Sequence, residues 1–200
     1  MFRSDREEVR SGAGLGRDCA ILTQPADSNQ DIVLSKWIGL EGTVQLVKKH
    51  YEKLRERFPL RMLEEAVCFD KYLSVIPEAA TAMKSGVCGM HDVSWGGIFA
   101  GLWEMAQEAG VGLEVNLRDI PVRQETIEIC EFFGENPYEI LSGGCLLMTA
   151  EDGNGLVEAL AMEEIPAAVI GRTTEGNDRV LYNEGRKRYL NKPRNYINYL

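Results

Sequence analysis

The sequence of 200 residues has few of the side chains from which metal and redox centres are usually built. It contains two histidines and five cysteines, and no two cysteines have the Cys-x-x-Cys spacing of zinc or dithiol sites. The segments around Cys68 and Cys130 are apolar, which favours small buried side chains over ligands. Neither a zinc site nor a dithiol redox centre is therefore expected.

Basic charge and long apolar runs are also scarce. The formal net charge is -9, whereas non-specific nucleic-acid binding needs a surplus of lysine and arginine on at least one face. No apolar run approaches the roughly 20 residues that span a bilayer, and the first residues, MFRSDREEVR, are charged rather than signal-like. We expect a cytoplasmic protein that binds neither nucleic acid nor membrane.

The pattern of apolar residues predicts a mixed domain. Residues 1–30 combine a glycine-rich turn, a short strand at 19–22 and a polar loop. A strand at 31–39 precedes helices at 41–57, 60–75 and 77–86. From residue 87 onward strands alternate with helices of 10 to 15 residues, which is typical of a layered α/β or α+β sheet. The stretch EGNDRV predicts a hairpin turn between two strands, and Asn154 is expected to cap a helix.

The stretch HDVSWGG, residues 91–97, joins a predicted strand to a predicted helix. Backbone N–H groups at a helix start can hold an anion, with Ser94 as a cap and Gly96 and Gly97 permitting close approach. Asp92 suits a divalent cation, and His91 suits proton transfer or a phosphate oxygen. In the alternative interpretation Asp92 or Ser94 merely caps the helix and the glycines permit tight packing.

Two further glycine-rich stretches leave similar alternatives open. Gly143 and Gly144 in LSGGCLLM either bring backbone amides to a ligand or form a turn before a strand. In GAGLGRDCAIL, residues 12–22, Asp18 is either a metal ligand or part of a leader, and the absence of a preceding strand excludes a dinucleotide fingerprint. Lys48, Lys49, Lys53 and Arg55 share one face of the helix at 41–57, which favours a solvated surface over an anion site.

Taken together, these stretches resemble the aminoimidazole-ribonucleotide (AIR) synthase superfamily, and most closely its hydrogenase-maturation-factor-like, AIR synthase-related members. The resemblance covers about residues 31–190 and is carried by segments 31–43, 69–106, 110–115, 120–144, 150–157 and 165–180. It implies an α+β fold for residues 31–200, an α/β/α sandwich with partial ferredoxin-like topology. Residues 1–30 would then be a remnant of the family's N-terminal ATP-binding domain, or a leader.

The resemblance also implies ATP and Mg²⁺ as ligands and assigns roles to particular residues. It implies His91 and Asp92 as catalytic residues, Asp18 and Asp92 as metal ligands, and Ser94, Gly96, Gly97, Ser142, Gly143 and Gly144 as the phosphate- or nucleotide-binding set. The chain departs from the family pattern at Arg17, where an acid is usual, and at Trp95, where the family commonly has a charged or small residue. Its tail NKPRNYINYL has no cysteine, so thiol chemistry of the hydrogenase maturation factor is not expected.

Two functions follow from this resemblance. The first is ATP-dependent phosphoryl-transfer chemistry that requires a partner chain, because one domain supplies too few cations around the phosphates. The second is a non-catalytic oligomerising or binding module derived from the same family. The expected partner is a second copy of the chain or a full-length relative.

Overall fold

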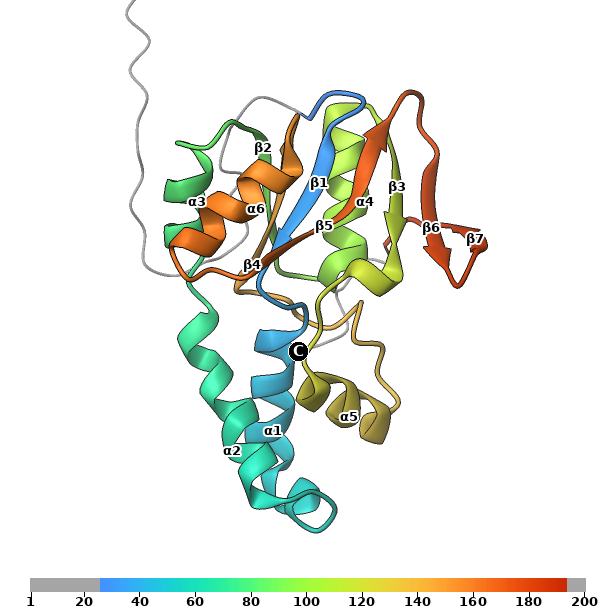
Figure 1. Ribbon diagram of the computed structural model, residues 1–200. Helices are drawn as coiled ribbons and strands as arrows, with labels where there is room; N and C mark the ends of the chain where they lie inside the picture. The colour runs from blue at the N-terminus through green and yellow to red at the C-terminus, as the bar shows by residue number, and fades with distance from the viewer. Residues whose placement is uncertain (1–25, 194–200) are drawn as a thin grey trace, which may run out of the picture.

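The computed structural model describes residues 26–193, which form a mixed sheet with helices on both faces (Figure 1). The strand order is β2-β4-β1-β5-β3-β6-β7, and every pair is antiparallel except β3–β6. The strands are β1 (Asp31–Ser35), β2 (Val87–Val93), β3 (Gly112–Asn116), β4 (Cys145–Ala150), β5 (Ala167–Thr174), β6 (Arg179–Asn183) and β7 (Arg186–Tyr189). The α+β prediction is confirmed.

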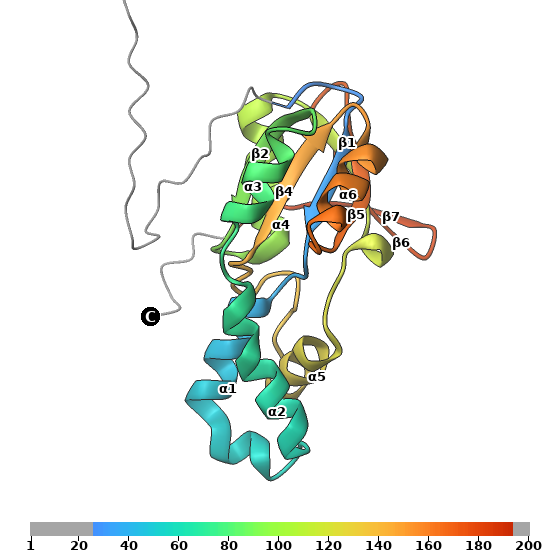
Figure 2. The ribbon, with the colours of Figure 1, turned by 60° about the vertical axis from the view of Figure 1, so that its left-hand side comes forward.

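Helices cover the two faces of the sheet and also extend beyond one of its ends. They are α1 (Leu40–Arg55), α2 (Leu60–Val67), α3 (Ile76–Ala82), α4 (Gly97–Ala109), α5 (Gln124–Phe133) and α6 (Gly153–Met162), with short 3-10 turns at Cys68–Tyr72 and Leu117–Asp119. Helix α4 packs on one face, and α3 and α6 pack on the other (Figures 1 and 2). This is the expected α/β/α sandwich. In the part of the chain that the structure describes, no helix is long and apolar enough to cross a bilayer.

The interior strand β4, next to edge strand β2, shows why the sheet needs both helical layers. All six of its residues are buried, and successive side chains point to opposite faces. Leu147 packs in the core beneath α4, whereas Leu146 and Met148 pack in the core beneath α3 and α6. A strand that is apolar on both faces must be covered on both.

Helices α1, α2 and α5 form a separate cluster below the sheet, as both views show (Figures 1 and 2). Their own core includes Leu40, Val47, Leu63 and Ile129, all of them buried. The chain enters α1 through Gly39, whose φ of 71° is left-handed, and a Cβ there would lie 2.8 Å from Thr126 Cγ2. This tight turn from β1 places the helical cluster against the lower end of the sheet.

Two local predictions were wrong. The EGNDRV segment does not make a hairpin, because β3 lies between β5 and β6 and pairs with both of them. Helix α6 is capped by Asp152 rather than Asn154, since the Asp152 side chain accepts a hydrogen bond from the Gly155 N–H at 2.9 Å.

Candidate functional site

A cleft of about 530 Å³ lies where the helical cluster meets the sheet. It is lined by α1, by the segment before α3, by the end of β2 with the turn that follows, and by the segment that joins α5 to β4. The lining residues are Glu41, Gly42, Gln45, Leu46, Lys49, Leu73, Val75, Asp92, Ser94, Trp95, Gly96, Glu135, Glu139, Ile140, Leu141, Gly143 and Gly144.

The structure brings two of the predicted stretches together in this cleft. Asp92, Ser94 and Gly96 line it from the β2–α4 connection, and Gly143 and Gly144 line it from the start of β4. The backbone N–H of Ser142 donates to the Ser94 carbonyl at 3.1 Å, which holds the two stretches side by side. Asp18 lies outside the described residues.

His91 and Asp92 do not face the same space, although they are adjacent in the sequence. Both belong to β2, and successive strand residues point to opposite faces. The His91 side chain, 13% exposed, lies toward α4, with Nε2 3.4 Å from Glu104 Oε2 and Nδ1 3.7 Å from Glu108 Oε2. Only Asp92 of this pair lines the cleft.

The glycines of both stretches have packing reasons for lacking a side chain. A Cβ on Gly97, whose φ is 66°, would lie 2.5 Å from the Tyr138 carbonyl oxygen. A Cβ on Gly143 would meet the Glu41 carboxylate, which is the end of a flexible side chain, and one on Gly144 would lie 2.7 Å from the Tyr72 carbonyl oxygen. Gly97 itself does not line the cleft. The tight-packing interpretation therefore accounts for Gly97 and Gly144, where a Cβ would meet backbone atoms. Contact of these stretches with phosphate stays a prediction.

The two predicted serines, Ser94 and Ser142, have different surroundings in the site. The buried Ser142 hydroxyl accepts from the Gly39 N–H at 2.9 Å and donates to the Ile140 carbonyl at 3.1 Å, so it is engaged away from the cleft. The prediction of a serine cap was wrong, because α4 begins after Gly96, which is left-handed and makes no side-chain cap hydrogen bond. Ser94 lines the cleft instead.

Glu41 is a cleft residue that the sequence patterns did not single out. It stands in the first turn of α1, accepts from Gln45 Nε2 at 3.2 Å and has its carboxylate beside Gly143. Burial raises the pKa of the Glu41 carboxyl, and the nearby charge of Asp92 raises it further. The pKa of Asp92 is also raised by burial, against a lowering by His91. The two carboxylates therefore face one partly desolvated space.

A buried ion pair holds another wall of the cleft. The Lys36 ammonium lies 2.5 Å from Glu78 Oε1, and both side chains are almost fully buried. The same ammonium donates to the carbonyls of Tyr72 and Ser74 at 2.7 Å each. These bonds fix the backbone on either side of Leu73, which lines the cleft. Lys36 is left-handed at φ 53°, and nothing in its local sequence predicts this role.

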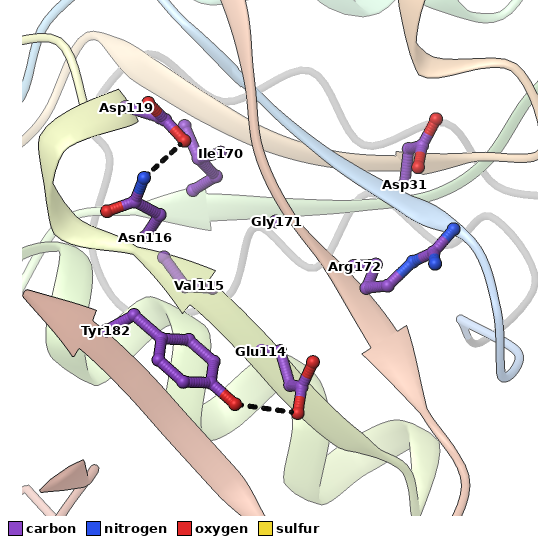
Figure 3. A pocket seen from close by; sticks show the side chains of 9 residues that line it. All are labelled: Asp31, Glu114, Val115, Asn116, Asp119, Ile170, Gly171, Arg172 and Tyr182. Carbon is purple, nitrogen blue, oxygen red and sulfur yellow. Dashed lines mark hydrogen bonds between the residues drawn. The ribbon is translucent and has the colours of Figure 1, made fainter. Parts of the chain in front are cut away.

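The described residues contain a second, smaller depression of about 250 Å³ (Figure 3). It lies on β3, β5 and β6 and contains none of the predicted site residues. Its acids already have partners: Tyr182 Oη donates to Glu114 at 3.2 Å, and Asn116 Nδ2 donates to Asp119 at 2.9 Å (Figure 3). The cleft at the helical cluster is therefore the candidate site.

Comparisons with known proteins agree with this fold. The model of the family described as AIR synthase related protein, C-terminal domain, matches residues 29–183. Carbamoyl dehydratase HypE of Rhodobacter capsulatus is 30% identical over 95 residues, which are 46% of this chain and 28% of that protein. Phosphoribosylformylglycinamidine synthase subunit PurL of Corynebacterium glutamicum (strain R) is 30% identical over 97 residues, 48% of this chain and 12% of that one.

Among solved structures, E. coli HypE, a hydrogenase maturation protein, superposes with a TM-score of 0.69 at 22% identity. The match covers 87% of this chain and 53% of that one. At this identity the likeness shows the fold alone. The matched part of the chain thus spans about half of E. coli HypE and smaller fractions of the two curated relatives.

Proposed function

Because the chain belongs to the family of AIR synthase related proteins, whose C-terminal domain matches its residues 29–183, we propose that its cleft is one wall of a composite site for ATP-dependent phosphoryl transfer, completed by a partner chain. The observation that carries this proposal is the convergence of Asp92 and the Ser94–Gly96 turn with Gly143 and Gly144 in one cleft. In this proposal residues 1–30 are either a remnant of an ATP-binding domain or a leader.

Structurally similar proteins support ATP as the nucleotide. Hydrogenase maturation protein HypE has been solved in complex with ATP, and AaThiL has been solved with AMPPCP and TMP. In this chain the nucleotide phosphates would lie along the Ser94–Gly96 turn, near the N-terminus of α4, where backbone N–H groups favour an anion.

The donor set of the cleft fits Mg²⁺ bound together with phosphates. Asp92 and Glu41 provide hard carboxylate oxygens in one space. Mg²⁺ is commonly held by one or two carboxylates, with water and phosphate oxygens completing its shell. The described residues contain no cluster of three or more acidic, histidine or cysteine side chains that could hold a metal without them. When bound, Mg²⁺ would neutralise phosphate charge, and Asp18 is a further ligand in this proposal.

The charge of the cleft favours a partner for catalysis. Its lining includes the carboxylates of Glu41, Asp92, Glu135 and Glu139 but only one basic side chain, that of Lys49. Phosphoryl transfer depends on cations placed around the phosphates, so the remaining cations would come from a full-length relative or a second copy. A HypE–HypF complex exists for one structural neighbour, which supports assembly with another chain.

Nuclear magnetic resonance of the isotope-labelled chain tests the nucleotide site. Adding Mg·AMPPCP should shift the amide signals of residues 92–96 and 143–144 and leave those of 114–116, in the second depression, unchanged. Asp92→Asn should require at least about tenfold more nucleotide to produce these shifts, and Glu114→Gln is the matched control. Shifts confined to the second depression, or no shift at millimolar nucleotide, would contradict the proposal.

The second candidate function is a binding or oligomerising module without catalysis. Ile76 (76% exposed) and Met83 (61% exposed) lie seven residues apart at the two ends of α3, and Trp95 is 44% exposed at the cleft. Exposed apolar side chains of this kind favour contact with another chain. Sedimentation velocity distinguishes this role: a dimer that Ile76→Asp dissociates, together with no response to nucleotide, would support it.

A further inference from the structure

The walls of the cleft are apolar, and one of them is aromatic. Leu46, Leu73, Val75, Ile140 and Leu141 contribute apolar side chains, and Trp95 presents an indole that is 44% exposed. The volume of about 530 Å³ falls within the range of small-molecule sites. Such walls suit a flat apolar ring, and the charge beside them decides which ring.

The charged groups of the cleft are carried mainly by the side of the helical cluster. Glu41 comes from α1, and Glu135 and Glu139 come from the segment that follows α5. Lys49 is the one basic residue among those that line the cleft. Its neighbour Lys48 turns away and bonds to Asp70 at 2.6 Å. Glu139 accepts a hydrogen bond from Asn136 Nδ2 at 3.0 Å, but no cation among the described residues pairs with it. The lining of the cleft therefore carries an excess of negative charge.

We infer that this cleft binds a small organic cation: a protonated amine or amidine on a flat apolar body, with its charge near Glu41, Glu135 and Glu139 and its ring against Trp95. The cation lowers the repulsion between the carboxylates, and the indole face attracts both the ring and the charge. This goes beyond the proposed function, since it assigns the chemical class of a second ligand and does not require nucleotide.

Three indole compounds of nearly equal shape and different charge test the inference. Tryptamine is a cation at pH 7, tryptophol is neutral and indole-3-acetate is an anion. Isothermal titration of the full chain without nucleotide or Mg²⁺ should rank them in that order. Tryptamine should bind at least about tenfold more tightly than tryptophol, as expected for a partly buried charged hydrogen bond.

Two variants test whether the preference for tryptamine over tryptophol arises in the cleft. Glu41→Gln should reduce the preference for tryptamine over tryptophol to within about threefold while leaving tryptophol binding unchanged. Glu114→Gln, in the second depression, should keep the wild-type preference, and circular dichroism checks that both variants are folded. Equal binding of the three compounds, tighter binding of the anion, binding of none, or loss of the preference in Glu114→Gln would each overturn the inference.

The outcome is separable from that of the proposed function. If the chain binds tryptamine but Mg·AMPPCP causes no shifts, the inferred cation site stands and the proposed nucleotide site fails. If Mg·AMPPCP causes the shifts but tryptamine does not bind, the nucleotide site stands and the cation site fails.

Discussion

Glu41 and Asp92 face one cleft from different layers of the fold, and the charge of Asp92 adds to burial in raising the pKa of Glu41. One carboxylate stands at the start of the helical cluster, and the other stands near the end of edge strand β2. Their proximity depends on the left-handed turn at Gly39 that directs the chain from β1 into α1. The site is therefore a product of how two substructures are joined.

The raised pKa values predict how stability depends on pH. A carboxyl whose pKa is higher in the folded state than in the unfolded state binds more protons when folded, so its stabilising contribution is fully present below the unfolded pKa. It is lost as pH rises from about 4 through the folded pKa values of Glu41 and Asp92. Glu41→Gln should raise the free energy of unfolding at pH 7 and flatten its decline above pH 4. Urea titrations at several pH values measure this, and a steeper decline in the variant would contradict it.

The geometry of β2 predicts different consequences for two adjacent substitutions. His91→Gln should leave Mg·AMPPCP binding within about twofold of wild type, because its side chain faces α4 rather than the cleft. Asp92→Asn should weaken binding by about tenfold or more, since it removes a charged ligand. Titration by nuclear magnetic resonance gives both dissociation constants. Equal losses in the two variants would show that His91 acts in the site.

Breaking the buried Lys36–Glu78 ion pair should lower the stability of the fold. Lys36→Met leaves Glu78 buried without its cation and should lower the free energy of unfolding by about 3–5 kcal/mol. The double variant with Glu78→Leu should recover most of the loss, because it removes the stranded charge. Arg61→Ala, which breaks the exposed Arg61–Glu65 pair, is the control and should cost less than about 1 kcal/mol. Similar losses for Lys36→Met and Arg61→Ala would contradict this role.

Gly97 and Gly110 offer a matched test of close packing. Both are left-handed, with φ near 66° and 67°, but a Cβ on Gly110 meets nothing within 4 Å. Gly110→Ala should therefore cost only the backbone term of about 1–2 kcal/mol. Gly97→Ala adds a clash with the Tyr138 and Ile140 carbonyls and should cost at least about 1 kcal/mol more. Chemical denaturation of the two variants measures the difference, and equal costs would show that the 138–140 segment moves aside.

Features encoded in short stretches could be predicted from the sequence. The strand, turn and helix around HDVSWGG and the end of α4 at Gly110 were predicted because periodicity and glycine positions are local signals. The structure places Asp92 and Gly143 in one cleft, and their role in binding stays a prediction. The burial of Cys130 was also predicted correctly, whereas Cys68 proved to be exposed.

Features that depend on distant partners could not be predicted in this way. The EGNDRV segment has hairpin chemistry, yet β3 separates the strands that it joins, because β3 pairs with residues more than 50 positions away. Glu41 and Lys36 have ordinary sequence surroundings and acquire their roles from Gly143, Asp92 and Glu78. The alternation of side chains along a strand does predict that His91 and Asp92 face opposite sides of β2. The adjacency of the two residues in the motif instead favours interpreting them as one site.

ATP turnover by the purified chain, with and without a full-length family member from the same cells, tests the account most directly. We expect no Mg²⁺-dependent phosphate release above the blank from the chain alone. Adding the wild-type chain to the full-length protein should raise phosphate release above that of the full-length protein alone. Adding the Asp92→Asn chain should not raise it. Steady turnover by the chain alone would contradict the claim that this cleft is one wall of a composite site.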